Sequence, residues 1–126
     1  MGFAQGELVL EVGYGADCDA ALRSEIMKIT GTKFLEGSTN EVIDAVLLWF
    51  REDDGDLVDE LMDAMAYLSE TGSIWVLTPK VGRAGHVQPS DIQDAAPTCG
   101  LSQTTTLAVA EDWTATRLVA RKVGKR

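Results

Sequence analysis

The sequence is poor in cysteine, in histidine and in long apolar runs. It holds one histidine and two cysteines among 126 residues, and Cys18 and Cys99 are too far apart for a metal motif or a disulfide framework. Such a set offers no obvious tetrahedral zinc site. No apolar stretch approaches the ~20 residues of a membrane-spanning helix, and the N-terminus lacks the basic region of a signal peptide. We therefore expect a cytoplasmic protein that does not bind membranes.

Negative charge dominates the composition, with a formal net charge of -9. Most acidic side chains lie in residues 1–72, whereas bases outnumber acids in residues 73–126. Because an acidic protein repels phosphate backbones, we expect no binding to nucleic acid. The length and the ordinary apolar content of 45% predict one folded domain over residues 1–126.

Strand-like and helix-like patterns alternate along the chain. Apolar runs predict strands at 8–12, 42–50, 73–78, 104–110 and 114–121, with a short strand at 32–35. Helical spacing predicts a helix from an Asp17 or Asp19 cap to Gly31, and further helices at 57–68 and 89–96. The last two strands read as an antiparallel hairpin.

This alternation predicts a Rossmann-like three-layer α/β/α fold. We expect a mixed, mostly parallel sheet of about five or six strands that ends in an antiparallel hairpin. One connection limits the parallel part, because about seven residues between Leu35 and Ile43 are too few for a parallel crossover. The strand at 32–35 is therefore absent, antiparallel or at an edge of the sheet.

Three loops should gather where such folds bind ligands, outside the carboxyl ends of the parallel strands. They are residues 13–19, 51–56 and 78–86. The third loop carries Lys80, Arg83 and the only histidine, His86, in an otherwise acidic protein. These side chains indicate contact with a small anionic ligand or a protein partner, with His86 able to carry a proton.

Another interpretation needs no ligand. The cationic loop can instead pair with the acidic side chains Asp53, Asp54 and Asp56 of the facing loop. The same carboxylates are the oxygen ligands that Mg²⁺ prefers. However, helix capping accounts for at least one of them, and Gly55 accounts for the turn. We predict no metal site.

Several short motifs are distinctive in combination. They are Asp44–Arg51, Asp53–Val58, Ile74–Lys80, Gly82–Arg83, Gly85–Val87, Pro89–Ile92, Ala95–Thr98, Gly100–Thr104 and Asp112–Thr114. Together they resemble the small actinobacterial family known as domain of unknown function 3052. The resemblance covers the chain from about Val9 to Ala120. It implies a cytoplasmic bacterial protein with an α/β fold, and it assigns no catalytic residue.

The segment Leu10–Gly15 is similar to the first motif of class I methyltransferases that use S-adenosylmethionine. That resemblance implies that Gly13 and Gly15 let the backbone approach a cofactor. Glu36, about 20 residues further on, would then bind ribose hydroxyls. Asp17 stands where the third glycine of the motif would fall, which weakens the match.

The leading hypothesis is a non-catalytic regulatory or interaction module, since the sequence holds no complete catalytic constellation and no G-x-S-x-G elbow. One alternative is a methyltransferase-like protein that binds S-adenosylmethionine or a nucleotide. Another is a thiol redox sensor, which requires the Cα atoms of Cys18 and Cys99 to come within ~7 Å. The oligomeric state is left open.

Overall fold

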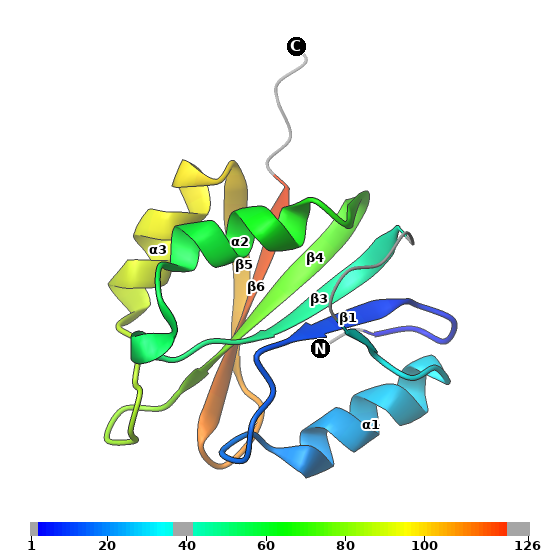
Figure 1. The fold of residues 1–126 in the computed structure, drawn as a ribbon, viewed down its shortest axis with the longest axis horizontal. Helices are drawn as coiled ribbons and strands as arrows, with labels where there is room; N and C mark the ends of the chain where they lie inside the picture. Colours follow the sequence, from blue (N-terminus) through cyan, green and yellow to red (C-terminus); the bar gives the residue numbers. More distant parts are fainter. Residues whose placement is uncertain (1–2, 37–41, 121–126) are drawn as a thin grey trace.

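The computed structural model describes residues 3–36 and 42–120. All strands in these residues lie in one mixed sheet (Figure 1). The elements are β1 (Val9–Val12), α1 (Ala20–Thr30), β2 (Leu35–Glu36), β3 (Ile43–Trp49), the 3₁₀ turn η1 (Glu52–Asp54), α2 (Leu57–Met65), β4 (Leu68–Pro79), α3 (Pro89–Thr98), β5 (Leu101–Ala108) and β6 (Trp113–Ala120).

The strand order is β2-β1-β3-β4-β6-β5. The first four of these strands run parallel, β6 is antiparallel to β4, and β5 is antiparallel to β6. Helices α2 and α3 cover one face of the sheet and α1 covers the other (Figure 1). The predicted three-layer Rossmann-like fold with its closing hairpin is confirmed. The short second strand lies at an edge, which was one of the three outcomes left open.

Strand β3 forms the centre of the core. Every residue of it except Asp44 is buried, as expected for a parallel strand covered on both faces. Alternate side chains enter two clusters: Val46 and Leu48 pack toward α2 and α3, whereas Leu47 and Trp49 pack toward α1. This central strand therefore links the two layers on which the site is built.

Local caps set the starts of α1 and α2. Asp19 accepts a hydrogen bond from the Leu22 N–H at 2.8 Å, and Asp56 accepts one from the Val58 N–H at 2.9 Å. Each carboxylate satisfies a donor that the first helical turn leaves free. Of the two predicted caps for α1, the structure selects Asp19.

Several predicted boundaries are wrong. Helix α2 ends at Met65 and not at residue 68, and β4 begins at Leu68 and not at residue 73, so Gly72 lies inside a strand. A Cβ atom at Gly72 would lie 2.7 Å from the Leu68 Cδ1 atom and 2.9 Å from the Asp44 backbone oxygen. Only glycine fits at position 72, because Leu68 and the Asp44 backbone lie too close for a Cβ atom. Strand β5 begins at Leu101, and α3 extends through Pro97 to its end. The predicted last residue of β6, Arg121, lies outside the described residues.

The sheet separates the two thiols. Cys18 packs against the cluster on the α1 face, whereas Cys99 belongs to the cluster on the opposite face. Both cysteines are free. A disulfide between them would need the sheet to open, so the structure does not support the redox switch. Within the described ranges, no helix has the length and apolar character needed to cross a membrane.

We expect Gly72→Ala to lower the free energy of unfolding by about 1–3 kcal/mol, because the added methyl group overpacks against Leu68 and the Asp44 backbone. Urea unfolding followed by circular dichroism measures the change. Thr71→Ala is the control, since it alters an exposed side chain of the same strand and should cost less than about 0.5 kcal/mol. Equal effects of the two substitutions would contradict the close-approach interpretation.

Candidate functional site

The three predicted loops do meet at the carboxyl ends of β1, β3 and β4. The Glu52 N–H donates to the Gly85 carbonyl at 2.9 Å, which joins the second loop to the third. The β5–β6 connection, residues 109–112, also reaches this end of the sheet, because the Lys80 N–H donates to the Asp112 carbonyl at 2.9 Å. The gathering of the loops is confirmed, and the hairpin adds a fourth segment.

Arg51 joins the first two loops through its guanidinium group. Its Nε and Nη2 atoms donate to both carboxylate oxygens of Asp17, at 2.8 and 2.7 Å. Its Nη1 atom donates to Asp54 at 3.0 Å, to the Gly13 carbonyl at 2.9 Å and to the Trp49 carbonyl at 3.3 Å. A bidentate pair with further carbonyl acceptors uses the planar donor geometry that only arginine provides.

The contacts of Arg51 shift the pKa values of the ionisable groups in and around it. The hydrogen bond from Arg51 lowers the pKa of Asp17 below its ordinary value, against a smaller opposing effect of burial. The hydrogen bond to Asp17 in turn raises the pKa of Arg51. Burial raises the pKa of the Cys18 thiol, although Gly15 N–H and Arg51 Nη2 both donate to its sulfur. A protonated thiol is a weak nucleophile.

The glycine turn after β1 is occupied by protein atoms. Gly13 has a φ of +82°, and a Cβ atom there would collide with the Trp49 backbone oxygen. A Cβ atom at Gly15 would lie 3.4 Å from Arg51 Nη2. Both glycines therefore serve local packing around the guanidinium group. Glu36 ends β2, where its backbone is the register partner of Glu11, and its predicted ribose contact stays a prediction.

An ion pair with a buried carboxylate lies on β1, just before the same turn. Glu11 is 4% exposed, and both of its carboxylate oxygens accept from Arg23 Nε at 2.8 Å. The indole N–H of Trp49 donates to the same carboxylate at 3.0 Å. The sequence reasoning missed this pair, and its one signal is an acidic residue inside an apolar strand.

Acidic side chains line the other side of the glycine turn. Glu60, on α2, lines hollows together with Gly13. Burial raises the pKa of Glu60, and the neighbouring charges of Asp63, Asp54 and Asp59 raise it further. Of the described residues that line these hollows, the cation is Arg51, which is already paired with Asp17 and Asp54, so a phosphate group there would face like charge. Among the described residues, no group of three or more His, Cys, Asp or Glu side chains is placed to hold a metal ion.

The predicted pairing of the cationic loop with the aspartate loop is wrong. Arg83 pairs with Asp112 of the hairpin, with Nη2 and Oδ1 2.7 Å apart. Asp54 pairs with Arg51 and Asp56 caps α2, while Asp53 is exposed on η1. The sequence could not reveal these partners, because strand pairing alone brings residues 80–83 beside residue 112.

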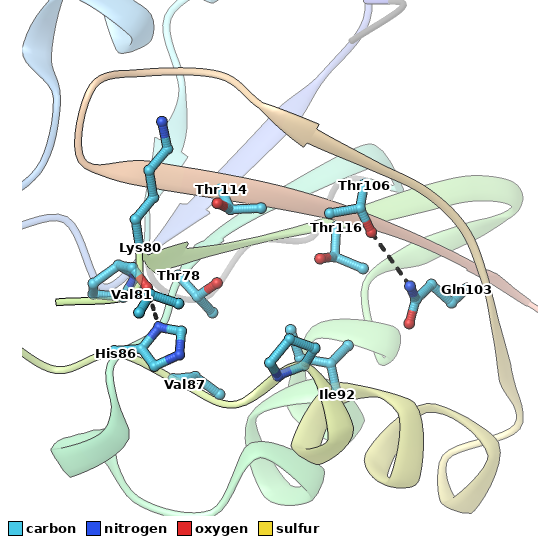
Figure 2. A pocket seen from close by; sticks show the side chains of 12 residues that line it. Thr78, Lys80, Val81, His86, Val87, Ile92, Gln103, Thr106, Thr114 and Thr116 are labelled. Atoms are coloured by element: carbon cyan, nitrogen blue, oxygen red, sulfur yellow. Dashed lines mark hydrogen bonds between the residues drawn. The ribbon is translucent and has the colours of Figure 1, made fainter. Parts of the chain in front are cut away.

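Lys80 and His86 instead line a hollow of about 410 Å³. We call it the threonine pocket. It lies on the α3 side of the sheet, between the 80–87 loop, the start of α3 and strands β4, β6 and β5 (Figure 2). Its lining consists of Thr78, Pro79, Lys80, Val81, His86, Val87, Pro89, Ile92, Gln103, Thr106, Thr114 and Thr116.

Two residues on the floor of the threonine pocket turn polar groups to the hollow. Thr78 and Thr116 are each 4% exposed, and neither hydroxyl makes a hydrogen bond to another described residue. Their hydroxyl oxygens are not among the buried side-chain atoms that lack a partner, so they are accessible from the hollow. The sequence reasoning missed both residues because each reads as an ordinary β-branched strand position.

The His86 ring has a defined hydrogen arrangement. Its Nδ1 atom lies 2.9 Å from the Pro79 carbonyl oxygen. A carbonyl oxygen can only accept, so Nδ1 carries a hydrogen and donates. In the neutral ring, Nε2 is then a hydrogen-bond acceptor, and Figure 2 shows it turned from the carbonyl toward the hollow.

A family model described as "Protein of unknown function (DUF3052)" matches residues 1–122. An uncharacterized protein of Mycobacterium tuberculosis H37Rv is 48% identical over 128 residues, which cover 100% of this chain and 80% of that relative. An uncharacterized protein of Mycobacterium bovis matches to the same extent.

The fold is similar to solved methyltransferases. A SAM-dependent methyltransferase from Aquifex aeolicus has a TM-score of 0.60 at 12% identity, covering 93% of this chain and 84% of that one. An O-methyltransferase from neocarzinostatin biosynthesis, in complex with S-adenosyl-L-homocysteine, has a TM-score of 0.66 at 12% identity, covering 91% and 49%. At such identities the likeness shows the fold alone.

We expect Arg51→Met to lower the free energy of unfolding by about 1–3 kcal/mol at neutral pH, because the Gly13 and Trp49 carbonyls lose their donor and two carboxylates lose their partner. Urea unfolding at several pH values measures it. Since the pKa of Asp17 is lowered in the folded state, its contribution is present above the ordinary carboxyl pKa and is lost as the pH falls through the lowered value.

Arg83→Met is the matched control, because it breaks an exposed pair that should contribute about 0–1 kcal/mol. The difference in stability between the wild-type protein and Arg51→Met should shrink in acid. A difference that grows in acid, or two variants of equal stability, would contradict the role given to Arg51.

Proposed function

The chain belongs to the family of proteins of unknown function called DUF3052, and we propose that it is a non-catalytic regulatory or interaction module that binds a small anionic ligand in the threonine pocket. The observation that carries the proposal is the pair of hydroxyls at Thr78 and Thr116, which line the hollow and make no hydrogen bond to another described residue. Both residues are otherwise buried, and their hydroxyls can donate to and accept from a polar ligand in the hollow.

The size and charge of the threonine pocket support a small ligand. Its volume of about 410 Å³ falls in the range of small-molecule sites, which are mostly apolar with a few directed polar groups. Lys80 forms no ion pair with a described acidic residue. A free ammonium group at the rim of an acidic protein favours an anion over a cation.

The arrangement of His86 argues against catalysis. General bases in hydrolytic sites are oriented by a carboxylate and stand next to a nucleophile. Here the ring nitrogen that would face such a carboxylate donates to a backbone carbonyl instead. The hydroxyls in the lining of the threonine pocket belong to threonines, and no carboxylate side chain lines it to orient His86. A binding role fits these groups better than a chemical step, and a cytoplasmic location remains a prediction.

The methyltransferase-like fold supports one alternative, a protein that binds S-adenosylmethionine or a nucleotide at Gly13, Gly15 and Glu36. Against both ligands, the guanidinium group of Arg51 occupies the glycine turn. The acidic groups around Glu60 further oppose the phosphates of a nucleotide, although they do not oppose the sulfonium cation of S-adenosylmethionine. Isothermal calorimetry with S-adenosylmethionine should show no saturable binding to the wild-type protein. Micromolar binding that is lost in Gly15→Val would establish the alternative.

We expect Thr106→Trp to abolish ligand binding, because Thr106 lines the threonine pocket from the exposed strand β5 and an indole there would fill the hollow. The measurement is a thermal-shift screen of a library of small metabolites against the wild-type protein, followed by calorimetry of each hit. Hits are expected to be anions.

Thr105→Trp is the matched control. Thr105 and Thr106 are adjacent and both exposed, but their register partners are Arg117 and Thr116, so they lie on opposite faces of β5. The control should bind every hit as the wild-type protein does. Hits that bind Thr106→Trp with unchanged affinity would overturn the proposal.

A further inference from the structure

The floor of the threonine pocket presents hydroxyl groups without a charge. Thr78 is the register partner of Thr114 across β4 and β6, and Thr116 is the register partner of Thr106 across β6 and β5. Partners in antiparallel strands share a face, so the four side chains form two adjacent rows (Figure 2). Only Thr106 has a side-chain partner among the described residues, Gln103, at 3.3 Å.

The walls of the threonine pocket are apolar. Val87 and Ile92 belong to the core cluster on this face and are each 4% exposed. Pro79, Pro89 and Val81 complete the walls. Such side chains offer contact to an apolar body of about the size of one ring, and they offer no further hydrogen bond.

Among the described residues that line the pocket, the lysine or arginine side chain is that of Lys80, at the rim. Lys80 lines the pocket, and in Figure 2 its side chain extends along the rim with the ammonium group away from Thr116. Arg83, the other cation of this loop, is bound to Asp112 and does not line the pocket. A ligand can therefore meet charge at one end and neutral hydroxyls at the other.

This separation decides the orientation of the ligand. A carboxylate on the floor would be desolvated beside the lone pair of His86 Nε2 and would have no cation within the floor, which is costly. A ligand hydroxyl at the same position can donate to Nε2 and accept from a threonine hydroxyl. The carboxylate is then best placed at the rim, where Lys80 and water solvate it.

We propose that the threonine pocket binds a hydroxylated monocarboxylic acid with an apolar body of ring size, its hydroxyl group on Thr78, Thr116 and His86 and its carboxylate beside Lys80. The inference rests on the proposed function and adds the chemical class and the direction of the ligand. A single rim cation matches one negative charge, which favours a monoanion over a phosphate dianion.

The experiment uses three probes that differ by one group. They are para-hydroxyphenylacetate, phenylacetate, which lacks the hydroxyl, and para-hydroxyphenylacetamide, which lacks the charge. Affinities come from ¹H–¹⁵N NMR titrations of the full chain at millimolar probe concentrations. We expect the first probe to bind about fivefold more tightly than each of the others, which is the effect of one hydrogen bond or one exposed charge contact.

Substitutions identify which residue binds the hydroxyl group of the probe and which binds its carboxylate. Thr116→Val keeps the shape and should remove the preference over phenylacetate while keeping the preference over the amide. Lys80→Met should do the reverse. Arg83→Met, the cation of the same loop outside the pocket, should keep both preferences. Amide signals of the folded variants report on folding in the same spectra, so lost affinity is not confused with unfolding.

Two results would overturn this inference. One is a crossed pattern, in which Thr116→Val removes the discrimination against the amide or Lys80→Met removes the discrimination against phenylacetate. The other is the absence of any shift at the pocket with all three probes. In either case the proposed function still stands if the thermal-shift library yields ligands that Thr106→Trp loses. It fails only if the library test also fails.

Discussion

The guanidinium group of Arg51 is the contact on which the carboxyl end of the sheet depends. It binds Asp17 in the first loop, Asp54 in η1 and the carbonyls of Gly13 and Trp49. The cation thereby holds the ends of β1 and β3 together. Acidic loops that would otherwise repel one another are joined because one arginine offers several donors in a plane.

The Arg51 contact and the threonine pocket are built from different segments at the carboxyl end of the sheet. On the α1 face, the Arg51 network and the buried Glu11–Arg23 pair occupy the region around the glycine turn. On the α3 face, the end of β4 and the antiparallel hairpin leave the threonine pocket open. A fold shared with methyltransferases thus carries a pocket over the hairpin strands in addition to the hollows beside the glycine turn. The likeness of fold does not carry the chemistry with it.

The sequence was a good guide to the loops and a poor guide to their partners. Apolar periodicity placed the strands, and the carboxyl ends of parallel strands must meet, so the gathering of the three loops could be foreseen. The ion pair of Arg83 could not, because Asp112 approaches only once β6 has paired with β4. Likewise, Thr78 and Thr116 resemble other strand residues until α3 is seen to leave them uncovered.

What the sequence determined by itself was local: the alternation of elements, the burial of β3 on both faces, a cap for α1 at Asp17 or Asp19, and a cap for α2 among Asp53, Asp54 and Asp56. These depend on spacing and on hydrogen bonds between near neighbours. The tertiary structure alone decided that Gly13 packs on β3 beside Arg51 and that a hollow lies over the threonines. Such features arise between segments far apart in the chain, where register and the approach of layers, rather than local propensity, set which groups meet.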